Sequence, residues 1–203
     1  MIGIPSRLTN PAVRFVLIRP GATDFDDQGR MKGCLDMPLS DCGHAQVTRV
    51  VQELSDVRFQ TIFTAPCESA KETAAALAAG RTTKVKVVEC FRNVDHGLWH
   101  GKLIEELRRN QPRIYRQGQE SPDSIQPPGG ETITQAKGRV LKAIRKVLKR
   151  SGDGAIALVI PDPLASVVQS LVGGDAMRNL WSAETDAAQW QWIEATMREP
   201  VVT

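Results

Sequence analysis

Two histidines that lie four residues apart, His96 and His100, are the side chains whose type and spacing first suggest chemistry. On a helix this spacing would place both imidazoles on one face, where they could hold a metal ion. Gly97 and Gly101 favour a loop instead, and the sequence shows no third ligand. We therefore predict no metal site and no cofactor. A nucleophilic role for His96 stays open as an alternative.

A second group of polar residues follows apolar segments that are far apart in the chain. Arg19 and Thr23 come after the apolar run 13–18, and Asp162 comes after the run 155–160. A guanidinium group can bind an anion, and a carboxylate can act as a base. These groups can cooperate only if the fold brings the ends of the two runs together.

Elements that would do so are visible in the pattern of apolar residues. Short runs rich in β-branched residues predict buried strands, and helical spacing between them predicts helices, one of them with Ser40 and Asp41 as N-cap candidates. The predicted strands cover 13–18, 59–65, 84–88 and 155–160, with an alternating edge strand at 189–195. The predicted helices cover 40–54, 66–79 and the stretch that runs through Leu171.

Strands that alternate with helices predict an α/β fold, a three-layer α/β/α sandwich around a mainly parallel sheet. In such a sheet the ligand crevice lies beyond the carboxyl ends of the strands. This rule selects four short segments. They are 19–23, 64–69, 91–95 and 161–163.

The composition is that of a globular chain, 41% hydrophobic and 24% charged, and we expect a single domain over residues 1–203. The net charge of +3 gives no reason to expect nucleic acid, and no apolar run suggests a signal peptide or a membrane span. We expect a cytoplasmic protein with no membrane partner. The cysteines form no CxxC pair, so we predict reduced, mostly buried thiols at Cys34, Cys42, Cys67 and Cys90.

Basic residues are concentrated in the predicted helix 132–150, and the segment 107–117 adds a further group. Such runs are commonly solvated helix faces. The sharper interpretation is a docking surface for an acidic protein partner. A small-molecule partner in the crevice is the other expectation.

The opening segment 17–46 resembles the histidine phosphatase superfamily, the phosphoglycerate-mutase-like proteins. That family has a strand ending in Arg-His-Gly-x-Thr, a Gly-Arg, a Gly-x-x-Asp-x-Pro-Leu and a polar-x-Gly helix start. The matching residues here are Arg19, Gly21, Thr23, Gly29, Arg30, Gly33, Asp36, Pro38, Leu39 and Gly43. Segments 65–74, 93–101, 127–132 and 157–163 continue the resemblance, which implies a phosphoglycerate-mutase-like fold over about 13–174.

The departures from the family pattern fall on its catalytic positions. Pro20 stands where the family has its nucleophilic histidine, and Ser69 where it has the second phosphate-binding arginine. Asn93 takes the place of the acidic proton donor, and Asp162 that of the second histidine. The resemblance therefore implies a vestigial phosphate pocket. It consists of Arg19, Pro20, Thr23, Ser69, Asn93 and Asp162.

These substitutions remove the chemistry that the resemblance implies. The nitrogen of Pro20 is a tertiary amide without a nucleophilic lone pair, and Asn93 has no acidic proton to give a leaving group. Arg19 opposite Asp162 leaves a pocket close to neutral, which should bind dianions poorly. We predict no catalytic residues and a non-catalytic binding module. An enzyme with residual or altered phosphatase or phosphomutase chemistry, based on His96 or Asp162, is the alternative.

Overall fold

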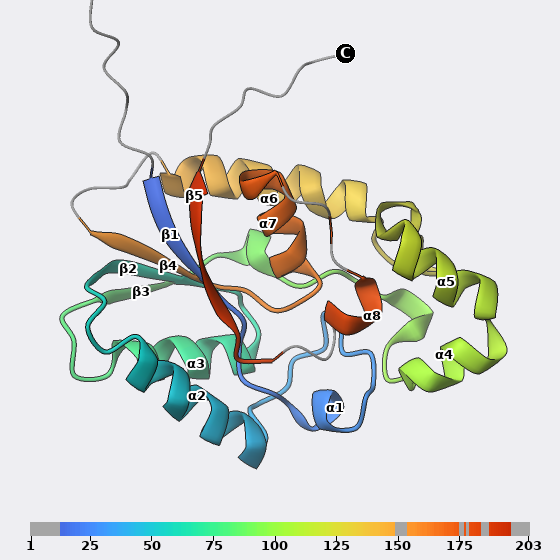
Figure 1. The fold of residues 1–203 in the computed structure, drawn as a ribbon, viewed down its shortest axis with the longest axis horizontal. Coiled ribbons are helices and arrows are strands. Elements are labelled where there is room, and N and C mark those ends of the chain that lie inside the picture. Colours follow the sequence, from blue (N-terminus) through green and yellow to red (C-terminus); the bar gives the residue numbers. More distant parts are fainter. Residues whose placement is uncertain (1–12, 149–153, 175–176, 178, 184–186, 196–203) are drawn as a thin grey trace, which may run out of the picture.

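The computed structural model describes residues 13–148, 154–174, 177, 179–183 and 187–195. Its centre is a five-stranded sheet in the order β3-β2-β4-β1-β5 (Figure 1). The strands are β1 (Val13–Ile18), β2 (Phe59–Thr64), β3 (Lys84–Val87), β4 (Ala155–Val159) and β5 (Trp190–Ala195). All pairs are parallel except β1 with β5, so the predictions of a mainly parallel sheet and of a terminal edge strand are confirmed.

Helices cover both faces of the sheet. On one side lie α2 (Asp41–Glu53) and α3 (Glu68–Ala78), and on the other α6 (Ile133–Leu148) and α7 (Leu164–Gly173) (Figure 1). Ser40 caps α2, because its hydroxyl accepts a hydrogen bond from the Gly43 backbone N–H at 3.1 Å. The predicted α/β/α sandwich is thereby confirmed. Residues 149 and 150 of the predicted basic helix lie outside the described residues.

The inner strands are buried on both faces of the sheet, which explains why they appear in the sequence as continuous apolar runs. Phe15, Leu17 and Leu158 on β1 and β4 are fully buried between the helical layers. The outer strand β3 differs, because Val85 and Val87 are exposed. The Lys-Val alternation of β3 is thus the pattern of an exposed edge.

A second, smaller core lies beside the sandwich. It is formed by Met31, Trp99, Leu107, Ile125, Leu180 and Trp181. The short elements around it are α1 (Asp24–Asp27), η2 (Gly97–Trp99), α4 (Ile104–Asn110), α5 (Pro112–Glu120), η3 (Pro122–Ser124) and α8 (Leu180–Ala183), and η1 (Glu89–Phe91) follows β3. The Trp181 ring stacks on Tyr115 at 5.5 Å between centroids and donates its indole N–H to the Tyr115 carbonyl at 2.6 Å. The segment 107–117 is therefore part of a packed helical unit.

The prediction of mostly buried cysteines is wrong. Cys34, Cys42 and Cys90 are exposed, and Cys67 is half-buried. None of these four cysteines forms a disulfide. Cys34 lies in a turn and Cys90 in the short surface helix η1, so neither belongs to the core elements in which cysteines are usually buried, and Cys42 lies on the exposed face of α2. Within the described ranges, no helix is both long enough and apolar enough to cross a bilayer.

Candidate functional site

The crevice is centred on two residues that follow neighbouring parallel strands, Arg19 after β1 and Asp162 after β4. The Arg19 Nε donates to the Asp162 Oδ2, and the two side chains are only 2% and 3% exposed. Ser166, in the first turn of α7, joins the pair. Its backbone N–H and hydroxyl donate to the Asp162 Oδ1 at 2.9 and 2.7 Å, and its hydroxyl accepts from Arg19 at 3.4 Å.

The electrostatics of this network are set by burial. Burial raises the pKa of the Asp162 carboxyl, while the Arg19 guanidinium and the Ser166 donors act in the opposite direction. Both oxygens of the carboxylate already accept hydrogen bonds from within the protein. The Arg19 charge is therefore compensated inside the chain, so an incoming anion would have to compete with Asp162.

The Asn93 side chain connects its own segment with the loop at Gly33 and with the segment 162–164 beside the ion pair. Its Nδ2 donates to the carbonyls of Gly33 and Asp162 at 3.0 and 2.5 Å, and its Oδ1 accepts from the Leu164 N–H at 3.2 Å. Asn93 is buried. With donor and acceptor both directed at backbone groups, the amide has a positioning role in this crevice.

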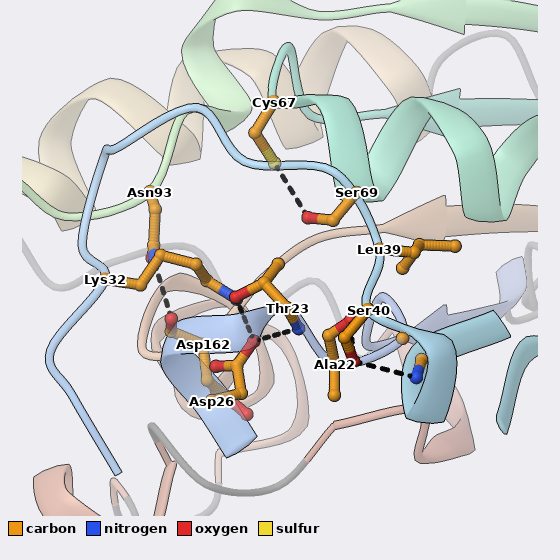
Figure 2. A network of polar contacts seen from close by, with 12 residues as sticks. Ala22, Thr23, Asp26, Lys32, Leu39, Ser40, Cys67, Ser69, Asn93 and Asp162 are labelled. Atoms are coloured by element: carbon orange, nitrogen blue, oxygen red, sulfur yellow. Dashed lines mark hydrogen bonds and ion pairs between the residues drawn. The ribbon is translucent and has the colours of Figure 1, made fainter. Parts of the chain in front are cut away.

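A second ion pair lies in the crevice, and sequence reasoning did not find it. The Asp26 Oδ2 accepts from the Lys32 Nζ at 2.6 Å and from the backbone N–H and hydroxyl of Thr23, both at 2.7 Å (Figure 2). Lys32 is a buried lysine, 7% exposed. It lies in an irregular loop, where no periodicity indicates which way a side chain points.

Ser69 joins the site through the first turn of α3. Its side chain is buried, with its hydroxyl 3.8 Å from the Cys67 thiol (Figure 2). One turn further along α3, the Thr73 hydroxyl donates to the Ser69 carbonyl at 2.7 Å and accepts from the Gly21 N–H at 3.2 Å. Helix α3 is thus joined to the loop that follows β1.

Pro20 is buried directly after Arg19, and its carbonyl accepts from the Ala188 N–H at 2.8 Å. Of the six residues predicted for the pocket, Arg19, Asn93 and Asp162 are in direct contact. Thr23 and Ser69 are connected to them through intermediate residues. Their roles as a vestigial phosphate pocket remain predictions.

Two glycines allow the loop after β1 to reach the N-terminus of α2. A Cβ on Gly43 would overlap the Ala22 carbonyl, and a Cβ on Gly21 would lie 2.6 Å from the Gly43 carbonyl oxygen. The Ser40 N–H also donates to the Ala22 carbonyl at 2.9 Å. This close approach fixes the backbone around Thr23.

Two further reactive side chains of the described residues, Cys67 and Lys71, lie on either side of Ser69 in the sequence. Burial raises the pKa of the Cys67 thiol, which disfavours the nucleophilic thiolate. Lys71 points outward and pairs with Glu68 at 2.5 Å on the surface of α3. Lys71 therefore does not provide the positive charge that the family's second arginine has at the position of Ser69.

Gly97 and Gly101 predicted a loop here, and the structure has one short 3-10 turn, η2, with His96 before it and His100 after it. His96 is 1% exposed, and its ring centroid lies 6.3 Å from that of His100. The sequence shows no third ligand for this histidine pair, but the fold places two further potential ligands beside His100. Folding of the loops brings Cys34, which is distant in sequence, and Asp95 close to the His100 ring.

The fold and the crevice define a class: a three-layer α/β sandwich with an arginine after its first strand and polar loops at the carboxyl edge of the sheet. The model of the histidine phosphatase superfamily (branch 1) matches residues 15–203. The chain belongs to this family.

Several relatives carry the names of phosphatases. Phosphoserine phosphatase 1 of Hydrogenobacter thermophilus is 28% identical over 191 residues, 94% of this chain and 90% of that protein. Fructose-2,6-bisphosphatase TIGAR of Xenopus tropicalis is 32% identical over 133 residues, 62% of this chain and 47% of that protein.

Solved structures show the same fold. Bacillus stearothermophilus YhfR superposes with a TM-score of 0.79 at 23% identity, over 91% of this chain and 96% of that one. A mycobacterial glucosyl-3-phosphoglycerate phosphatase, solved with VO3, superposes with a TM-score of 0.79 at 21% identity, over 90% and 96% of the two chains. At these identities the likeness concerns the fold alone.

Proposed function

We propose that the protein is a non-catalytic histidine phosphatase-like protein, a pseudophosphatase that acts as a ligand- or protein-binding module. The observation that carries this proposal is the buried contact between Arg19 and Asp162. The guanidinium that would bind a substrate phosphate is instead bound to a carboxylate of the same chain.

Two further features of the crevice support the proposal. Phosphoryl transfer through a covalent intermediate needs a nucleophile and a proton donor. Pro20 offers an amide nitrogen without a reactive lone pair, and Asn93 uses its amide to bind three backbone groups. Replacement of a single group could be compensated, but loss of both leaves no recognisable route for the family reaction.

The charges of the crevice support it as well. Its two buried cations, Arg19 and Lys32, each contact a carboxylate, Asp162 and Asp26. Enzymes stabilise the transition state of phosphoryl transfer mainly with positive charge that is already in place and is not compensated by an anion. This crevice instead balances each cation with an anion.

A phosphatase or phosphomutase with altered chemistry is the second candidate, and the names of the relatives favour it more directly than the first. His96 could serve as nucleophile and Asp162 as base. Because His96 is 1% exposed, its imidazole would reach a substrate only if the loop around η2 moved. This candidate predicts that activity depends on His96 or on Asp162.

The ligand of a binding module would be a small molecule in the crevice or an acidic protein on α6. On α6, Lys137 pairs with Asp123 at 2.7 Å and Arg139 with Glu131 at 2.7 Å. The basic side chains exposed on this helix include Lys142, Arg145 and Lys146. An acidic partner would meet this second group.

The deciding experiment measures turnover by the purified chain of an aryl phosphate, phosphoglycerate and phosphoserine, together with a search for an acid-labile phosphoenzyme. We expect neither turnover nor phosphoenzyme above background. His96→Gln and Asp162→Asn are the informative variants, with His44→Gln, exposed on α2, as the matched control. Turnover that survives purification, is lost in either informative variant and persists in the control would establish the second candidate.

A further inference from the structure

Three side chains with different donor atoms converge outside the ion pairs of the crevice. The Cys34 Sγ lies 3.6 Å from the His100 Nε2, and the Asp95 Oδ1 lies 3.6 Å from the same nitrogen. One donor atom of each residue lies within 4.8 Å of those of the other two. We propose that Cys34, Asp95 and His100 form a binding site for a single divalent metal ion of the zinc type.

The distances between the donors match those of a zinc site. With Zn–S near 2.3 Å, Zn–N near 2.05 Å and tetrahedral angles, sulfur and nitrogen ligands lie about 3.6 Å apart, and nitrogen and oxygen ligands about 3.4 Å apart. The observed separations are 3.6 Å for both pairs. The cluster therefore needs little rearrangement to surround an ion, and three protein ligands leave the fourth position to water or another ligand.

The arrangement is that of ligands around a common centre and differs from that of a catalytic triad. In a triad the nucleophile contacts one imidazole nitrogen and the orienting carboxylate contacts the other. Here Cys34 and Asp95 both approach Nε2 of His100. Partial desolvation in the loop and the Asp95 charge also raise the pKa of the Cys34 thiol, which disfavours a free thiolate nucleophile.

Charge and tautomer suit a divalent cation. One thiolate and one carboxylate would balance the two positive charges, with the thiol proton released to the buffer on binding. The His96 backbone N–H points at the His100 Nε2 at 3.2 Å, which requires the tautomer whose Nε2 carries no proton. Coordination would replace this hydrogen bond.

The backbone holds the histidine and the cysteine close together. Gly33 precedes Cys34 and has a φ of +53°. A Cβ at this position would lie 2.6 Å from the His100 Nε2 and 2.9 Å from the His96 Cδ2. A glycine is therefore needed for His100 to reach Cys34. On the other side, Asp95 is fixed by a hydrogen bond from the Gly97 N–H at 2.8 Å.

The test uses the purified full chain after treatment with a chelator. Zinc affinity is measured by competition with a chromophoric chelator, and cobalt(II) is added as a spectroscopic probe. We expect one saturable zinc equivalent, and a cobalt complex with a thiolate-to-metal charge-transfer band and the intense visible bands of four-coordinate cobalt.

Three variants each remove one ligand. Cys34→Ser should abolish the charge-transfer band, and Cys34→Ser, His100→Gln and Asp95→Asn should each weaken zinc binding by at least about tenfold. Asn at position 95 retains an oxygen that can accept from Gly97, so this variant keeps the local fold. Cys42→Ser and His44→Gln, at exposed positions on α2, are the matched controls and should bind zinc like the unmodified chain.

Absence of saturable zinc binding by the unmodified chain would overturn the proposal. A charge-transfer band that persists in Cys34→Ser would do the same, as would zinc affinity that falls equally in the controls. The measurements do not depend on turnover, so their outcome is separate from that of the proposed pseudophosphatase function.

Discussion

Arg19 and Asp162, which are 143 residues apart in sequence, form a buried ion pair at the carboxyl edge of the sheet. Their contact links the ends of β1 and β4, two neighbouring inner strands of the sheet. The pair thus belongs both to the crevice and to the folded framework. Its removal can therefore be followed through stability as well as through ligand binding.

We predict that Arg19→Gln destabilises the protein at neutral pH by roughly 3–5 kcal/mol, because it leaves the buried Asp162 carboxylate without a cation. Arg19→Gln combined with Asp162→Asn should recover most of this loss, since neither side chain is then charged. Urea unfolding of both single variants and the double variant gives the coupling free energy. The control is Arg108→Gln in the exposed pair with Glu105, where the change should stay within about 0.5 kcal/mol. Additive single-variant effects would show that the pair is not coupled.

The loss in Arg19→Gln should depend on pH. Burial already raises the Asp162 pKa above its unfolded value of 3.8, and removing Arg19 takes away the largest opposing influence. A carboxyl whose folded pKa is raised contributes stability that is complete below the unfolded pKa and is lost as pH rises through the folded pKa. Relative to the unmodified chain, the variant should therefore recover stability as pH falls from 7 toward 4. A difference in unfolding free energy that stays constant over this range would contradict the prediction.

The fold could be predicted because its main signals are local. Central strands such as β1 and β4 are buried on both faces and appear as continuous apolar runs, and Ser40 marks the start of α2. The carboxyl-edge rule for parallel sheets then brings Arg19, Asn93 and Asp162 to one edge, where the structure has them in contact.

The parts that sequence analysis missed depend on irregular backbone. Lys32 and Cys34 lie in the loop between α1 and α2, where no periodic pattern indicates side-chain direction. The ion pair of Lys32 with Asp26 and the approach of Cys34 to His100 arise from tertiary folding of that loop. The helices α4 and α5 were also missed, because Pro112 and the dense charges around it obscure their apolar positions.

Packing of the smaller core can be tested with two glycines that both lie inside helices. A Cβ at Gly118 in α5 would overlap the Trp181 indole ring, whereas a Cβ at Gly138 in α6 would meet no atom within 4 Å. Gly118→Ala should lower the unfolding free energy by about 1–3 kcal/mol, and Gly138→Ala should raise it by roughly 0.5–1 kcal/mol. Denaturant titration of both variants measures the difference. Equal effects of the two substitutions would show that the indole ring moves aside freely.

The last prediction concerns anion binding. We expect inorganic phosphate to bind the crevice weakly, because Asp26 and Asp162 already neutralise Lys32 and Arg19. Asp26→Asn should strengthen phosphate binding by at least about tenfold at low ionic strength, since one charge pair at about 4 Å is worth up to roughly 4 kcal/mol at an effective dielectric of 20. The asparagine oxygen can still accept a hydrogen bond from Thr23, so the loop keeps this contact while Lys32 loses its anionic partner.

Asp27→Asn makes the same change of charge at an exposed position of the same helix and is the matched control. Calorimetric titration of phosphate into the three proteins, repeated at higher salt, separates the local effect from a general one, because screening acts on exposed charges more than on buried pairs. Tight binding by the unmodified chain, or equal gains in Asp26→Asn and Asp27→Asn, would show that the buried ion pairs do not control access of anions to this crevice.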